Sequence, residues 1–511
     1  MRLLLNNRVK LIVFAFLFIT NTAFTQHASL SEIQKIREQG FDSSGLRELA
    51  IELTDGIGPR LSGTRGSQNA AEWAVNRLKA MGLSNVELKP WGEFGKGWQT
   101  EKFYIAQTKP YYQPLIAVPQ AWTGGSNGLQ KAEVIMVSAQ TPEKLMEYKG
   151  QLKGKVIIQP ISEDLEVLFE SYANRFSDEE LGKFDEIPIV KPDKDPYFKS
   201  RNSNSKFDSD NLPFSFLKEF AQKEGALAVI ANSGSWGVVR SYGDRNGRNL
   251  DSLGIAVIDM TYEHIARMVR LIDRGVNVEI ELDINNHLVS EYSTGYNVFA
   301  EIPGTDKVLK DEIVMLGAHY DSWHGGTGGN DNGSGVIACM EVMRILKSSG
   351  LKPKRTIRIA LWGSEEQGLH GSKNWVNDNV YNSDTKTKLP LHSKISAYYN
   401  FDYGTGRIRG IYINNNLALK PIFKELFKPI NDLGVSYTSM RSPGGSDHLN
   451  FTSVGIPGFA FIQDRIEYGR GYHTNMDTFE RIHLGDLKQA AVVMAAIVFQ
   501  TANYPEKLPR K

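Results

Sequence analysis

The sequence has almost no cysteine, because Cys339 is the only one among 511 residues. A single cysteine excludes a disulfide bond within the chain. Apolar residues at helical spacing surround Cys339, and this pattern predicts a buried packing residue rather than a nucleophile. The chemistry of the protein is therefore expected to depend on other side chains.

The sequence also lacks an excess of charge of one sign. It contains 59 Lys and Arg against 58 Asp and Glu, for a formal net charge of +1, and no long run of either sign occurs. Proteins whose main partner is nucleic acid or an anionic membrane usually carry a basic patch or tail. We therefore expect no nucleic acid as a partner.

Long hydrophobic runs are missing too, and the one near the amino terminus is short. Arg2, Arg8 and Lys10 precede the apolar residues 11–19, and small and polar residues follow around Ala23. About nine apolar residues are far fewer than the roughly 20 that a membrane-spanning helix needs. This pattern is typical of a secretory signal peptide. We expect residues 1–25 to be removed, the protein to be periplasmic or extracellular, and no stable membrane insertion to follow.

The remaining sequence is typical of a large globular protein with more than one domain. Residues 26–105 contain an amphipathic helix at 70–81 and a strand at 85–89. Residues 106–290 differ in character, because short apolar strands bounded by Gly, Lys and Asp dominate them. Within this region, residues 176–212 are rich in Lys, Asp, Ser and Pro, so a long surface loop is expected there.

From residue 291 to residue 511, strands and helices alternate. Such alternation predicts an α/β fold with a mainly parallel, mixed sheet between layers of helices. In such sheets, ligands bind beyond the carboxyl ends of the strands. The expected strands are residues 313–316, 356–362, 396–401 and 459–462, and the main helices are residues 335–348 and 486–502.

Polar clusters lie at or just beyond the ends of these strands. Singly, each has an ordinary explanation: Asp331 as a helix cap, Glu365 and Glu366 as the start of a helix, and His473 as a surface histidine. Together they would be costly as unpaired buried charge. The side chains that can bind metal are His319, Asp331, Glu366, Asp402 and His473.

Two imidazoles and three carboxylates without thiolate suit zinc, with cobalt or manganese as alternatives. Two ions that share Asp331 would each have two further protein ligands. Glu365 is then a spare carboxylate beside a ligand, able to act as general base on a metal-bridging hydroxide or water. Asp321 lies two residues from His319 and is expected to accept the other imidazole proton.

The sequence resembles the co-catalytic zinc exopeptidases, which include bacterial leucyl aminopeptidases, glutamate carboxypeptidase and plasma glutamate carboxypeptidase. The surroundings of Asp402 look closest to the plasma glutamate carboxypeptidase branch. The resemblance rests on four motifs, His319-Tyr320-Asp321-Ser322, Asn330–Gly335, Ser364–Leu369 and Tyr472-His473.

The resemblance implies two zinc ions per chain and a peptide substrate. One zinc would be held by His319, Asp331 and Asp402, and the other by Asp331, Glu366 and His473. It also implies that Glu365 is the general base and that the Tyr472 hydroxyl stabilises the oxyanion. Residues 106–290 look like the protease-associated domain inserted in several members, which leaves 26–105 and 291–511 as the two segments of the peptidase domain.

Several alternatives stay open at this point. A single-zinc enzyme similar to glutaminyl cyclases is disfavoured by the full ligand set, and a non-catalytic relative similar to receptors of this fold would have lost ligands. Aminopeptidase or dipeptidase action on short peptides is slightly favoured over carboxypeptidase action. Asp447 is a candidate for binding an amino group, and Arg441, Arg465 and Arg470 for binding a carboxylate. A homodimer is one alternative for the oligomeric state, which the sequence leaves open.

Overall fold

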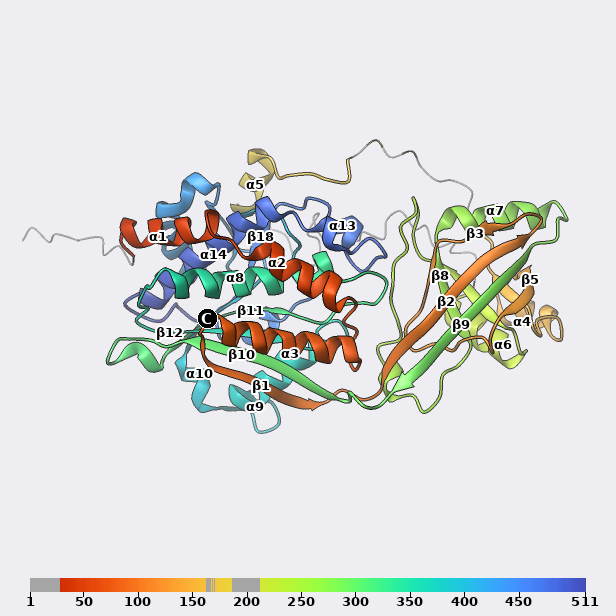
Figure 1. Cartoon of the computed structure of the whole chain (residues 1–511), viewed down its shortest axis with the longest axis horizontal. Coiled ribbons are helices and arrows are strands. Elements are labelled where there is room, and N and C mark those ends of the chain that lie inside the picture. The colour runs from red at the N-terminus through yellow and green to blue at the C-terminus, as the bar shows by residue number, and fades with distance from the viewer. Residues whose placement is uncertain (1–27, 162–166, 168, 170, 186–211) are drawn as a thin grey trace, which may run out of the picture.

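The computed structural model of the chain describes residues 28–161, 167, 169, 171–185 and 212–511. The predicted signal peptide, residues 1–25, therefore lies outside the described residues. Two bodies lie side by side in Figure 1, a larger one with helices on both sides of a sheet and a smaller one around a second sheet. Each sheet has eight strands.

The first sheet is mixed. Its central strands run parallel, whereas β10 pairs antiparallel with β1 and β12, and β16 pairs antiparallel with β18 and parallel with β17. In spatial order the strands are β1 (Ser84–Glu93), β10 (Thr294–Ile302), β12 (Thr356–Trp362), β11 (Ile313–His319), β15 (Ile395–Asn400), β18 (Gly458–Gln463), β16 (Ile408–Tyr412) and β17 (Tyr437–Ser439). The predicted α/β fold with a mixed sheet is confirmed.

Helices cover both faces of this sheet. The larger core contains α1 (Leu30–Phe41), α2 (Leu46–Ala50), α3 (Arg65–Ala80), α8 (Ser334–Ser348), α11 (Leu419–Phe427) and α14 (Leu484–Asn503). The other face packs against α9 (His370–Asn379) and α12 (His448–Thr452), with α10 (Pro390–Lys394) nearby. Nearly every residue of helix α14 is buried, and its segment 490–499 is apolar on all sides, as expected of a buried helix.

Two features of these helices can be compared with what the sequence predicted. Cys339 in α8 is fully buried, as predicted. Helix α3 begins earlier than the apolar pattern indicated, because the Thr64 side chain accepts a hydrogen bond from the Ser67 amide and caps its first turn. No helix among the described residues is both long and apolar enough to cross a membrane.

The second sheet is built between residues 97 and 289. Its long antiparallel pair, β2 (Gly97–Lys109) and β9 (Glu279–Val289), also connects it to the first body. The strand order is β3 (Gln113–Pro114), β2, β9, β5 (Gln130–Met136), β6 (Val156–Ile158), β7 (Ala228–Asn232), β8 (Ala256–Met260) and β4 (Ala117–Pro119). Helices α4 (Pro142–Leu145), α6 (Phe214–Lys223) and α7 (Tyr262–Asp273) belong to this body. That it is a protease-associated domain stays a prediction.

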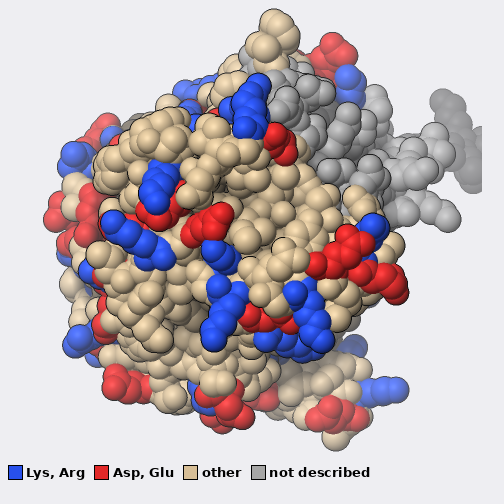
Figure 2. Space-filling view, turned by 90° about the vertical axis from the view of Figure 1, so that its right-hand side faces the viewer, with Lys and Arg blue, Asp and Glu red and all other residues tan. Residues whose placement is uncertain are grey.

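The outer face of this smaller body carries charged side chains of both signs, interspersed with uncharged residues (Figure 2). In the same body, Lys102 of β2 pairs with Asp283 of β9, and Lys109 pairs with Glu279. Oppositely charged neighbours of this kind form no basic stripe on the face that Figure 2 shows.

The predicted surface loop at 176–212 is wrong for its first part. Residues Asp178–Asp185 form helix α5, and its side chains Leu181 and Phe184 are buried with Phe176 against Ile462. The two buried side chains are three residues apart and share one face of the helix. The charged residues around them concealed this short pattern. Residues 186–211 lie outside the described residues.

Candidate active site

The candidate site lies at the carboxyl ends of three adjacent parallel strands. β11 ends at His319, which is in register with Trp362 at the end of β12. Glu365 and Glu366 follow β12, and Asp402 follows β15, the other neighbour of β11. Because parallel neighbours end at the same edge of a sheet, residues far apart in the sequence meet there.

Two further segments complete the cluster. Asp331 lies in the loop that connects β11 to α8, and His473 follows the short helix α13 (Tyr468–Gly471). The backbone of His473 has a φ of 54°, in the left-handed region that non-glycine residues seldom adopt. A constrained backbone is therefore part of what directs this imidazole towards the site.

The five predicted metal ligands are brought together. The Nε2 atom of His319 lies 3.1 Å from Asp402 Oδ1 and 3.5 Å from Asp331 Oδ1. The Nε2 atom of His473 lies 3.0 Å from Asp331 Oδ2 and 2.8 Å from Glu366 Oε2. The two oxygens of Asp331 thus face different histidines, which is the arrangement that a bridging carboxylate needs.

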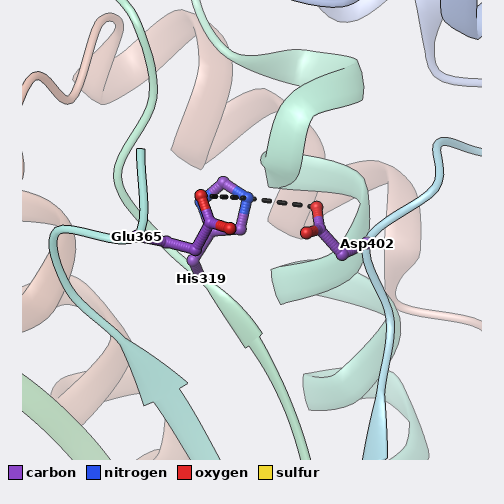
Figure 3. A group of neighbouring side chains, drawn as sticks. All are labelled: His319, Glu365 and Asp402. Carbon is purple, nitrogen blue, oxygen red and sulfur yellow. Dashed lines mark hydrogen bonds and ion pairs between the residues drawn. The ribbon is translucent and has the colours of Figure 1, made fainter. Parts of the chain in front are cut away.

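Glu365 lies closer to the ligands than the sequence indicated. Its Oε2 is 4.0 Å from His319 Nε2, and Figure 3 shows its carboxylate beside His319, with Asp402 on the other side of the imidazole. Ligand atoms of His319, Glu365 and Asp402 lie within 4.8 Å of one another, and so do those of His319, Asp331 and Glu366. These are two overlapping groups that share His319.

Burial shapes the protonation of these side chains, which are between 1% and 8% exposed. Burial raises the pKa of Glu366 to about 7 and that of Glu365 well above its ordinary value. Burial alone would lower the pKa of His319, but Asp402 and Glu365 outweigh it and the pKa is raised. The same balance, with Glu366 and Asp331 as the anions, raises the pKa of His473.

These residues fit a divalent metal ion. The carboxylates are crowded and buried, a costly arrangement unless cations compensate for their charge. Glu366 Oε1 is buried without a hydrogen-bond partner among the described residues. A donor set of imidazole nitrogens and carboxylate oxygens is the one that zinc accepts. Metal binding therefore accounts for both the crowding and the unpaired oxygen.

Asp321 has a different role from the one predicted. Its backbone carbonyl, not its side chain, lies 3.1 Å from Nδ1 of His319 and accepts the imidazole proton, whereas Oδ1 is 3.6 Å away. The carboxylate instead accepts hydrogen bonds from the backbone amides of Glu365 and Glu366, at 3.0 and 3.1 Å. The carbonyl still fixes the tautomer that leaves Nε2 free for a metal.

Tyr472 lies against the site by ring stacking. Its ring is 3.7 Å from that of His473, at an interplanar angle of 21°. Burial, together with the charges of Asp331 and Glu366, raises the pKa of its hydroxyl, which therefore stays protonated at neutral pH. Stabilisation of an oxyanion by this hydroxyl stays a prediction.

Arg60 helps to hold the site together, and this role was not predicted from the sequence. Its guanidinium group is fully buried and donates to the carbonyls of Tyr320, Thr327 and Gly328 at 2.6–2.7 Å, and of Gly58 at 3.1 Å. It thus connects the segment that follows His319 to the loop that leads to Asp331. The surrounding Gly58-Pro59-Arg60 gives no sign of this contact in the sequence.

Asp477 was also missed. This buried carboxylate accepts hydrogen bonds from the backbone amides of Asn330 at 2.5 Å and Asp331 at 3.3 Å. Arg60 lies close enough to favour its charged form, although burial dominates and raises its pKa. Asp477 and Arg60 therefore both hold the loop of Asp331. No pattern of residue spacing in the sequence identifies Asp477 or Arg60 as part of the site.

The other candidates for substrate binding have local partners. Asp447 is fully buried, and one of its oxygens accepts from the Ser372 hydroxyl. Burial raises its pKa to about 7. The Nε2 atom of His324 lies 2.7 Å from the carbonyl of Pro119.

The three arginines proposed for a carboxylate all lie over aromatic rings of residues 172–184. The guanidinium groups are between 5.1 and 5.8 Å from the ring centroids, within the range of cation–π attraction. The pairs are Arg441 with Phe184, Arg465 with Phe176, and Arg470 with Tyr172.

The chain is similar to known proteins over most of its length. Mouse (Mus musculus) carboxypeptidase Q is 25% identical over 491 residues, which cover 94% of this chain and 89% of that protein. A peptidase M28 precursor from Shewanella amazonensis shares the fold, with a TM-score of 0.66, 23% identity, and coverage of 94% of this chain and 98% of that chain. A zinc aminopeptidase from Bacillus subtilis has a TM-score of 0.55 and 19% identity, and covers 89% and 93% of the two chains.

The family pattern of peptidase family M28 matches residues 297–498. This segment contains all the predicted ligands, together with Glu365, Asp321 and Tyr472. The relatives named carboxypeptidase and aminopeptidase both act at chain termini, which confirms the resemblance to exopeptidases. Residues 297–498 therefore match peptidase family M28, and the predicted assignment as an exopeptidase is confirmed.

Proposed function

We propose that the protein is a two-zinc exopeptidase that hydrolyses terminal peptide bonds of short peptides or dipeptides. The observation that carries this proposal is the placement of Asp331 between two imidazoles, 3.5 Å from His319 and 3.0 Å from His473. His319, Asp331 and Asp402 would hold one zinc, and Asp331, Glu366 and His473 the other. When bound, the zinc ions would polarise the scissile carbonyl and acidify a water molecule.

Glu365 is proposed as the general base. Because burial raises the pKa of its carboxyl above the ordinary value, it can take a proton from water and return it to the departing amine. Asp321 holds the backbone amides of both Glu365 and Glu366, so it sets the base and a ligand at a constant separation. Tyr472, fixed by its stack on His473, is proposed to donate a hydrogen bond to the oxyanion.

Aminopeptidase or dipeptidase action is slightly favoured. The buried Asp447 interacts electrostatically with Glu365 and Asp402, and negative charge at this position attracts a substrate ammonium group. The three arginines considered for a substrate carboxylate lie over aromatic rings instead. Export to the periplasm or cell exterior is also proposed, from the pattern of residues 1–25.

The terminal specificity can be tested with blocked dipeptides and longer peptides. Purified protein with zinc is offered each substrate with a free or acetylated amine and with a free or amidated carboxylate. Loss of hydrolysis on acetylation supports aminopeptidase or dipeptidase action. Loss only on amidation contradicts it and supports a carboxypeptidase.

The role of Glu365 can be tested with Glu365→Gln. General-base catalysis typically contributes about 10²- to 10⁴-fold, so kcat should fall by about that factor while both zinc ions are retained. Activity near that of the unmodified protein would remove Glu365 from the reaction. Loss of one zinc would instead assign Glu365 as a ligand, in keeping with its distance from His319 and Asp402.

A further inference from the structure

The two histidines of the site are held in different ways. His319 ends a strand, and its Nδ1 donates to the carbonyl of Asp321 at 3.1 Å. His473 lies in a loop, and its buried Nδ1 has no hydrogen-bond partner among the described residues. A metal-bound imidazole usually donates its second N–H to an acceptor, which fixes the ring. Other contacts must therefore orient His473.

Some of these contacts come from the smaller body. We call its residues 237–242 the clamp segment. The amide of Ser241 donates to the carbonyl of His473 at 2.8 Å, and the amide of Asn475 donates to the carbonyl of Val239 at 2.9 Å. The Asn475 side chain accepts from the Val239 amide at 2.8 Å and donates to the Gly237 carbonyl at 3.2 Å. These bonds hold the carbonyl of the left-handed residue His473 and Asn475, which lies two residues after it.

The imidazole ring of His473 is enclosed by other rings. Tyr242 of the clamp segment meets it edge to face, with centroids 5.2 Å apart and an interplanar angle of 85°. Tyr472 stacks on it at 3.7 Å, and Trp323 lies 6.1 Å away. Tyr242 and Trp323 also contact each other, at 5.8 Å. Packed rings restrict rotation of the imidazole, as a hydrogen bond at Nδ1 would otherwise do.

The geometry points to a positioning role for the clamp segment. Its backbone bonds and the ring of Tyr242 keep Nε2 of His473 against Asp331 and Glu366, where Nε2 lies 3.0 and 2.8 Å from their oxygens. The smaller body thus supplies residues that position a side chain of the site. This inference rests on the proposed function, because it takes His473 as a zinc ligand. It predicts that only the zinc held by His473 depends on the clamp segment.

The test measures zinc binding without any substrate. Zn²⁺ is titrated against a competing chelator into the metal-free chain and into three variants, Tyr242→Ala, Tyr242→Phe and Asn475→Ala. Loss of a partner that orients a ligand typically weakens metal affinity by about 10- to 100-fold. We expect this loss for one zinc in Tyr242→Ala and Asn475→Ala, with the other zinc unaffected. Tyr242→Phe keeps the ring and should bind both ions normally.

A matched control is Asn285→Ala, which removes an asparagine of the smaller body whose side chain donates to Glu101 at 2.9 Å on an exposed surface. It should bind both zinc ions as the unmodified chain does. Wild-type affinities in both Tyr242→Ala and Asn475→Ala would overturn the inference, and so would equal losses in Tyr242→Phe and Tyr242→Ala. An unmodified chain that binds fewer than two zinc ions would instead contradict the proposed function.

A second measurement needs no variant. Filling the zinc site at His473 should slow amide hydrogen exchange at Ser241 and Val239, because their bonds to the loop of His473 then open less often. Strand β7 of the same body serves as the internal reference and should show no change. Equal exchange of the clamp segment with and without zinc would overturn the inference.

Discussion

Replacing Arg60 by lysine should weaken zinc binding more than it disturbs the rest of the fold. The guanidinium group donates to four backbone carbonyls, of Gly58, Tyr320, Thr327 and Gly328. Lysine keeps the charge, but its three donors sit on one atom and cannot reach acceptors spread around a planar fork. At least two of the four carbonyls would lose their donor.

The size of the effect follows from these carbonyls. Each buried acceptor left without a donor costs about 1–3 kcal/mol, so two cost about 2–6 kcal/mol. In the metal-free chain the loop of Asp331 can relax and expose them to water, whereas zinc binding draws the loop back. The unpaired carbonyls then make the free energy of zinc binding less favourable, and a change of about 2 kcal/mol corresponds to a loss of roughly 30-fold in zinc affinity.

The assay is competition for Zn²⁺ against a chelator, with circular dichroism to confirm the fold. Arg355→Lys is a matched control, because Arg355 is 1% exposed, pairs with Glu312 at 2.8 Å and donates to backbone carbonyls. It precedes β12, at the end of the strand opposite the site. Wild-type zinc affinity in Arg60→Lys, or an equal loss in Arg355→Lys, would refute the reasoning.

Three further predictions concern the metal and the packing around it. Chelation should abolish hydrolysis and lower the thermal midpoint, and zinc restored to about 1,000 times its Kd should add about 4 kcal/mol of stability. The metal-free chain should lose stability as pH rises from about 4.5 to 7. Burial raises the pKa of Glu366 in the folded chain to about 7, so the folded chain binds more protons than the unfolded chain over this range. Denaturant unfolding at stepped pH measures the free energy of unfolding, and an increase with pH would contradict the prediction. Gly335→Ala should impair zinc binding, because a Cβ there would lie 2.3 Å from Asn332 Oδ1 and 2.4 Å from the Phe401 carbonyl. Titration with Zn²⁺ measures the affinity. An unchanged affinity would show that the loop accommodates the methyl group.

Much of the peptidase body was predictable because its signals are local. Apolar strands followed by polar residues predicted the edge where His319, Glu366 and Asp402 meet. The repeated apolar pattern of α8 and α14 predicted buried helices, and both are buried. Strand ends and helix faces leave regular traces in a sequence because hydrogen bonding and burial act over a few residues.

What sequence reasoning missed depends on contacts between distant segments. Arg60 reaches residues more than 250 positions away, and no periodicity reports a guanidinium that binds backbone carbonyls. Asp321 was expected to use its carboxylate on His319, yet the carbonyl of the same residue is nearer. The clamp segment contacts the loop of His473 partly through backbone groups, which any sequence supplies. Tertiary structure determines which of these groups come into contact.

The central claim is that two cations share Asp331. Crystals of the chain grown with zinc should show, in anomalous difference maps at the zinc absorption edge, two peaks about 3.5–4 Å apart. One oxygen of Asp331 should face each peak, with His319 and Asp402 beside one and Glu366 and His473 beside the other. A single peak, or zinc bound away from Asp331, would contradict the account.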